Sequence, residues 1–160
     1  SAPRRKSNPI ERSNAMIAEE NKSAIRTLSV AKEVLIAAPA EVVFETVLEP
    51  HGPMKELKMK LEPWPGGRWF RDLGNNTGHL WGHVQVIKPP KLLELVGPMM
   101  MSYPVASHIQ YRLIEQPGGI LLKLTHQAMG LIPPELQQDV SKGWGEMLEH
   151  IRMSAEKKRG

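Results

Sequence analysis

The 160-residue sequence contains no cysteine. This absence excludes a disulfide framework, thiolate catalysis and zinc sites built on cysteine ligands. A chain without disulfides suits a reducing compartment, so we expect a cytoplasmic protein.

Long apolar runs are also missing. No stretch approaches the ~20 apolar residues of a membrane-spanning helix, and the N-terminus lacks the apolar core of a secretory signal. With 41% hydrophobic and 24% charged residues, the composition is that of a globular chain. The length predicts one domain that buries a substantial core, without a membrane span.

The basic charge of the chain is confined to its ends. Six basic and three acidic side chains lie in residues 1–29, and four basic and one acidic lie in residues 152–160. Since the whole chain carries a net charge of +4, residues 30–151 carry −2. Solvated basic tails explain this distribution without a nucleic-acid partner, and we expect none.

The chain divides into a domain and two tails. Residues 1–26 are polar and lack apolar periodicity, which predicts a disordered or tag-derived segment. Ser13-Asn14-Ala15 before Met16 is typical of a cleaved-tag remnant, which would make Met16 the native start. Residues 27–155 form the expected single domain, and residues 156–160 form a basic C-terminal tail.

Apolar periodicity predicts seven strands and two helices. The expected helices cover residues 40–48 and about 133–155, and the second carries an apolar stripe from Leu136 to Ile151. A sheet with one dry face and a long C-terminal helix to cover it indicates an α+β fold. The expected strands cover residues 28–36, 57–61, 67–73, 78–88, 91–96, 105–115 and 120–128.

The glycine-rich stretch EPWPGGRWFRDLGNNTGHLWGHV, residues 62–84, raises the question of a phosphate loop. No helix follows its glycines, so the helix N-terminus that binds phosphate is missing. The stretch instead predicts a hairpin with strand tryptophans, and alternation places His79, Trp81 and His83 on the outer sheet face. Residues four apart on a strand lie roughly 13 Å apart, so the two histidines are not expected to bind one metal ion.

Three segments resemble a known family. They are VLIAAPAEVVFETV, PGGRWFRDLGNNTGHLWGHVQVIKPPKLLEL and LTHQAMGLIPPELQQDVSKGWGEMLEHI. Over residues 27–153 the chain looks like the bacterial heat-shock-protein-90 ATPase activator homologues of the SRPBCC/START-like superfamily. The W-G-x-V…P-P-x-x-L and G-W-G-x-x-L runs carry most of the resemblance. It implies a helix-grip fold, in which a curved seven-stranded antiparallel sheet wraps around a long C-terminal helix. It also implies a cavity for a hydrophobic small molecule, without a universal catalytic set.

His126 is the strongest candidate for site chemistry. It alternates in phase with Ile120, Leu122 and Leu124, so its ring should point toward the helix. There it would act as an acid/base, contact a ligand, or serve as a hydrogen-bonded core histidine. The candidate ligand-binding residues are Phe44, Trp69, Met100, Tyr111, His126, Trp144, Met147 and Leu148, although the same set could be plain core.

Three functions follow from these residues. The first is binding of a hydrophobic or aromatic small molecule, with no metal or cofactor. The second is a cyclase- or hydrolase-like enzyme that uses His126 as acid/base. The third is a co-chaperone-like interaction module, with a protein partner or a second copy of the chain at Trp81 or at the apolar loop Met99-Met100-Met101.

Overall fold

Alternating apolar residues place the strands in one antiparallel sheet. In this computed structural model, the described residues 2, 3, 6, 8–13 and 24–159 contain seven strands in the order β1-β7-β6-β5-β4-β3-β2. Each strand pairs with its neighbours in antiparallel fashion. The strands are β1 (Arg26–Ile36), β2 (Lys60–Leu61), β3 (Arg68–Gly74), β4 (Thr77–Lys88), β5 (Leu92–Gly97), β6 (Val105–Gln116) and β7 (Gly119–Gly130).

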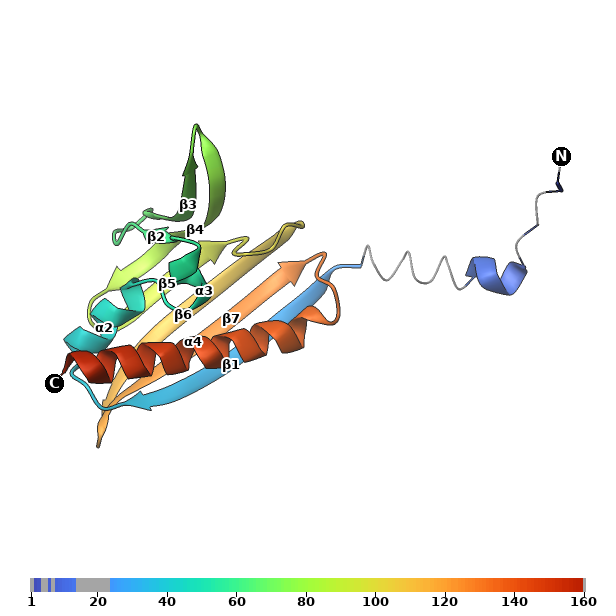
Figure 1. The fold of residues 1–160 in the computed structure, drawn as a ribbon. Helices are drawn as coiled ribbons and strands as arrows, with labels where there is room; N and C mark the ends of the chain where they lie inside the picture. The colour runs from blue at the N-terminus through green and yellow to red at the C-terminus, as the bar shows by residue number, and fades with distance from the viewer. Residues whose placement is uncertain (1, 4–5, 7, 14–23, 160) are drawn as a thin grey trace.

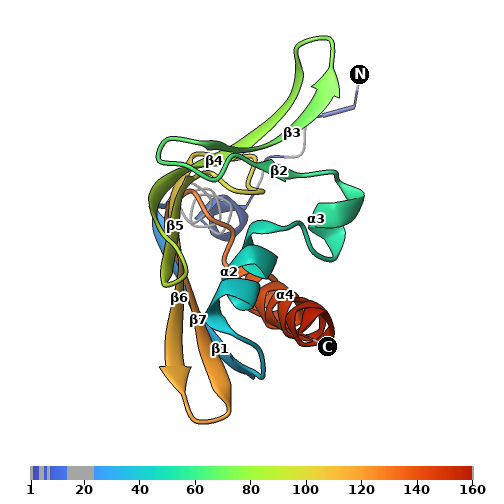
Figure 2. The ribbon, with the colours of Figure 1, turned by 90° about the vertical axis from the view of Figure 1, so that its left-hand side faces the viewer.

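Three helices of the domain lie on one face of this sheet. They are α2 (Ala40–Leu48), α3 (Pro53–Glu56) and α4 (Leu136–Lys158). Figure 2 shows the sheet curving around the side on which α2, α3 and α4 are placed. The α+β class predicted from the sequence is confirmed.

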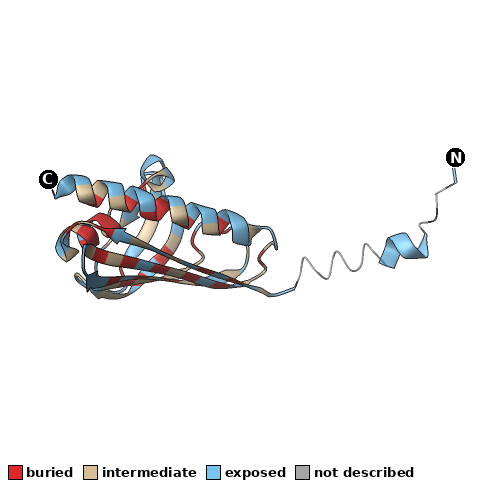
Figure 3. Ribbon diagram, turned by 90° about the horizontal axis from the view of Figure 1, so that it is seen from below, coloured by how far each residue is buried: buried red, intermediate tan, exposed pale blue. Residues whose placement is uncertain are grey.

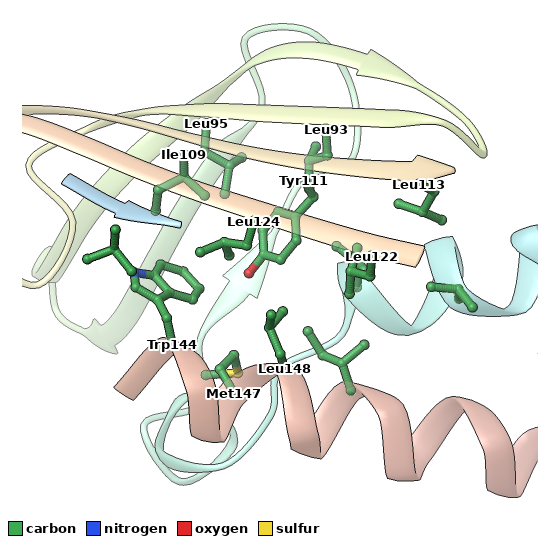
Figure 4. Packing of buried hydrophobic residues seen from close by; sticks show 14 of the residues in the cluster. Leu93, Leu95, Ile109, Tyr111, Leu113, Leu122, Leu124, Trp144, Met147 and Leu148 are labelled. Atoms are coloured by element: carbon green, nitrogen blue, oxygen red, sulfur yellow. The ribbon is translucent and has the colours of Figure 1, made fainter. Parts of the chain in front are cut away.

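The core forms between α4 and the sheet. The buried side of α4 carries Val140, Trp144, Met147, Leu148, Ile151 and Ala155, which follow one another at steps of one, three and four residues along one stripe. Figure 3 shows this buried stripe turned toward the sheet. It meets strand residues such as Ile109, Tyr111, Leu122 and Leu124 (Figure 4). Each fully buried apolar side chain stabilises the fold by about 1.5–3 kcal/mol.

The C-terminal helix runs further than the sequence predicts. It continues through residues 156–158, which we expected in a basic tail. Lys158 forms an ion pair with Glu49 and donates a hydrogen bond to the Thr46 hydroxyl at 3.2 Å. Both partners lie at the C-terminal end of α2, where a positive charge is favoured. The prediction of a tail was therefore wrong for these three residues.

Two other segments also differ from expectation. The strand expected over residues 57–61 is reduced to Lys60–Leu61, because α3 and a left-handed residue at Lys58 (φ 56°) occupy the chain before it. Residues 9–13, within the segment expected to be disordered, are helical. The same expectation for residues 14–23 lies outside the described residues.

The β3–β4 hairpin projects beyond the sheet (Figure 1). Asn75 and Asn76 both adopt left-handed backbone conformations, as the predicted turn requires. Trp69 pairs with Gly82 and Phe70 pairs with Leu80. This register shift leaves Trp81 without a paired residue on β3. Its half-buried ring packs edge-on against Trp69 at 5.2 Å, and the prediction of a surface tryptophan was wrong.

Gly97 marks a close approach between β5 and β4. A β-carbon at this residue (φ 149°) would lie 2.5 Å from both the Gly82 Cα and the Trp81 carbonyl oxygen. We therefore expect Gly97→Ala to lower the free energy of unfolding by about 1–2 kcal/mol in urea denaturation. Gly66→Ala is the control, because Gly66 (φ 82°) also has a left-handed backbone but open space around it. An equal loss in both variants would contradict a steric requirement at Gly97.

Candidate functional site

A small inner chamber lies between α4 and the half of the sheet that contains β3, β5 and β6. Its volume is about 40 Å³, enough for a water molecule but not for a larger ligand. Trp69 and Tyr111 approach it from the sheet, and Trp144 and Met147 approach it from α4. Met54 of α3 also lines the chamber.

An apolar groove lies on the outer side of the same residues. Its volume is about 280 Å³, and it is bounded by Met54, by Met100 in the loop after β5, and by Leu136, Val140 and Gly143 of α4. Met54, Trp144 and Met147 line both the groove and the chamber. These three side chains therefore form the partition between the two spaces.

One phenol hydroxyl, that of Tyr111, faces the chamber (Figure 4). Tyr111 is 6% exposed, and burial raises the pKa of its hydroxyl above the ordinary value. The hydroxyl forms no hydrogen bond with another described residue. No fully enclosed polar atom lacks a partner in the described part of the chain, so this hydroxyl reaches open space in the chamber. Figure 4 shows it pointing from the sheet toward α4.

His51 adds a second polar group to the chamber wall. Its buried ring lies in the turn between α2 and α3, and its Nε2 is 2.6 Å from the carbonyl oxygen of Thr46. A carbonyl oxygen only accepts hydrogen bonds, so Nε2 carries the proton that is donated. In the neutral ring, Nδ1 is then left as an acceptor.

His126 is fully buried and both of its ring nitrogens are in use. The Trp144 indole N–H donates to Nδ1 at 2.9 Å, which places the proton of the neutral ring on Nε2. Nε2 in turn donates to the Ser107 hydroxyl at 3.2 Å. Burial lowers the pKa of His126 to about 4. His126 lines neither the chamber nor the groove, and this geometry favours a structural role over acid–base catalysis.

The structure separates the eight predicted ligand-binding residues into four groups. Trp69 and Tyr111 line the chamber, Met100 lines the groove, and Trp144 and Met147 line both. The remaining three, Phe44, His126 and Leu148, are buried in the core away from both spaces.

The methionine loop Met99-Met100-Met101 is partly buried and partly exposed. Met99 and Met101 are 2% and 7% exposed and are tucked against the core, whereas Met100 is 41% exposed at the groove. Met54 and His51, which sequence reasoning missed, come from the irregular connection between α2 and β2. Gly143 was also missed, because its contribution to the groove is the absence of a side chain.

The chain belongs to the family described as activator of Hsp90 ATPase homolog 1-like protein (AHSA1), whose model matches residues 37–156. This agrees with the fold and confirms the resemblance found in the sequence. A search of curated proteins gave no match.

Solved structures of similar proteins share the helix-grip fold. The AHSA1-like protein from Rhizobium etli is 29% identical, with a TM-score of 0.53 over 81% of this chain and 82% of that one. A protein from Mesorhizobium loti is 19% identical, with a TM-score of 0.61 over 81% and 97% of the two chains. CalU16 from Micromonospora echinospora is 20% identical, with a TM-score of 0.56 over 82% and 86%. The seven-stranded sheet around a long C-terminal helix is thus the fold of this family.

None of the helices in the described residues is long and apolar enough to cross a membrane.

Proposed function

We propose that this protein binds an apolar small molecule in the groove between α3, Met100 and α4, and that the ligand extends into the inner chamber. The observation that carries the proposal is that groove and chamber share a wall made of Met54, Trp144 and Met147. At about 280 Å³, the groove is close to the lower limit of ordinary ligand sites, which begin near 300 Å³. Joined to the chamber, it would reach that limit.

The two methionines are the movable part of this wall. Trp144 is held by its hydrogen bond to His126 and by edge-to-face contacts with Tyr111 and His126. The side chains of Met54 and Met147 lack a polar group that would fix them in this way. A methionine side chain has three rotatable bonds and adapts to irregular apolar shapes. Rotation of the methionines would open the chamber while the tryptophan stays in place.

The Tyr111 hydroxyl would orient the ligand inside the chamber, whose wall also contains His51. The enzyme alternative is less well supported, because the nitrogens of His126 are occupied by Trp144 and Ser107.

Gly143→Leu is expected to weaken binding of the neutral fluorescent probe N-phenyl-1-naphthylamine by more than tenfold. The position of a β-carbon at Gly143 has no atom within 4 Å, so a leucine fits the helix and fills the groove. A fluorescence titration measures the affinity, and native mass spectrometry gives the number of bound probes.

The matched control is Gln138→Leu. Gln138 is exposed on the same helix and does not line the groove, so the same side chain is added without blocking it. Thermal unfolding checks that both variants fold. Failure of the wild-type protein to bind the probe, or equal affinity in Gly143→Leu, would overturn the proposed site.

A further inference from the structure

The outer rim of the groove is acidic. Asp139, Gly143, Glu146 and His150 follow one another along α4 at intervals of four, three and four residues, and all four line the groove. Residues at these intervals lie on the same side of a helix. Both carboxylate side chains belong to exposed residues, and neither forms an ion pair with another side chain in the described part of the chain.

Gly143 leaves an open space between the two carboxylates. It lies four residues after Asp139 and three before Glu146, and the position of its missing β-carbon has no atom within 4 Å. Helix neighbours at these intervals are about 5–6 Å apart at their β-carbons. A bulky head group placed over Gly143 would therefore contact both carboxylates while its body lies on Val140 and Met147.

The charge of the groove differs from that of the whole chain. The protein carries a net charge of +4, yet among the described residues lining the groove there is no lysine or arginine. Lys142 is the nearest basic residue along the helix, but it lies outside the lining and forms no ion pair with either carboxylate in the described structure. An anionic ligand would be repelled here, whereas a cationic head group would be attracted.

The chamber supplies a polar contact for such a ligand. Tyr111 is more than nine-tenths buried, and its hydroxyl has no partner among the described residues although it reaches the chamber. A ligand that reaches this hydroxyl can form a hydrogen bond with it in place of a water molecule. Met54 and Met147 line both spaces and therefore lie between the groove and the chamber that contains the hydroxyl.

We propose that the ligand is an amphipathic organic cation, an amine or quaternary ammonium group with an apolar body. The cation lies over Gly143 between Asp139 and Glu146, and the apolar body passes the methionines toward Tyr111. This inference rests on the proposed function and specifies the ligand class of the same site.

The test compares three probes with one decyl chain. The measurement is how tightly each compound displaces the neutral naphthylamine probe in low salt. The three compounds are decyltrimethylammonium, 1-decanol and decyl sulfate, each used below its micelle-forming concentration. One exposed ion pair changes an equilibrium by up to about fivefold, so we expect the cation to bind about tenfold more tightly than the alcohol. The sulfate should bind most weakly, and the preference should shrink in 0.5 M salt, where the screening length is roughly 4 Å.

Variants separate the carboxylates from the apolar groove. The double substitution Asp139→Asn/Glu146→Gln should abolish the preference for the cation over 1-decanol. The control Glu45→Gln/Glu115→Gln removes the same charge from exposed residues outside the groove and should keep the preference.

The outcomes distinguish the two proposals. Binding of all three probes with equal affinity, or a cation preference that survives in Asp139→Asn/Glu146→Gln, overturns the cationic ligand and leaves the apolar site standing. Absence of binding by every probe, the naphthylamine included, overturns the proposed function and the cationic ligand together.

Discussion

Replacement of Trp144 by alanine is expected to lower the free energy of unfolding by about 3–5 kcal/mol, as for other large aromatic residues in cores. Trp144 is 4% exposed and packs edge-to-face against Tyr111 and His126, with ring centroids 6.1 and 5.8 Å away. Its loss leaves a cavity between sheet and helix and also leaves Nδ1 of His126 without its donor. Urea denaturation at pH 7 measures the change.

Two further variants test this explanation. Trp144→Phe keeps most of the ring volume but removes the indole N–H, so we expect a smaller loss of about 1–3 kcal/mol. Trp64→Ala removes a tryptophan that is 54% exposed and should change the stability by less than about 1 kcal/mol. A loss in Trp144→Ala no larger than that in Trp64→Ala would contradict the central position assigned to Trp144.

Regular periodicity made most of the fold predictable from the sequence. The alternation in β6 and β7 and the apolar stripe of α4 placed these elements to within a few residues, because one face of each is buried over its whole length. Residues 57–61 also alternate, yet they form mainly a turn. Pro53 and the left-handed backbone of Gly52 and Lys58 direct this segment, and alternation does not reveal such local conformations.

Apart from Met100 in the loop after β5, the site was predictable only where it lies on regular elements. Tyr111, Trp144 and Met147 were found because they share the inner face of a strand or the stripe of a helix. Alternation also placed His126 inside correctly, but it could not show that Trp144, 18 residues later, would donate to its ring. His51 lies in a turn and Met54 in the one-turn helix α3, and neither segment is long enough to carry a periodic pattern.

The region around Trp69 shows how one irregularity changes side-chain placement. Alternation alone does not decide whether Trp69 or Phe70 faces inward, and the structure places Trp69 at the chamber. Phe70 instead lies beneath the Arg68 guanidinium at 4.2 Å. The register shift between these two residues also brings Trp81 against Trp69. A bulge of this kind depends on pairing with another strand, and no single-strand pattern reports it.

Acidification is expected to destabilise the protein through His126. Its pKa is about 4 in the folded protein because of burial, against 6.5 for an exposed histidine. The unfolded chain therefore binds more protons between these values, and folding stability falls as the pH is lowered from 6.5 toward 4. This pKa difference contributes about 3 kcal/mol to the free energy of unfolding. The contribution is fully present above pH 6.5 and is lost by pH 4. Protonation of Nδ1 would also break its hydrogen bond from Trp144.

Urea denaturation between pH 7 and pH 4.5 isolates this contribution. Glu62, whose pKa is lowered to about 2 by its hydrogen bonds with Arg68, keeps its stabilising effect in that range and loses it only at lower pH. His126→Gln should be less stable than the wild type at pH 7, because the geometry around Trp144 and Ser107 is disturbed, but its stability should depend much less on pH. His79→Gln replaces an exposed histidine of the β3–β4 hairpin and should keep the wild-type slope. If the slope survived in His126→Gln, the acid sensitivity would have to arise from other groups and the buried neutral state of His126 would be refuted.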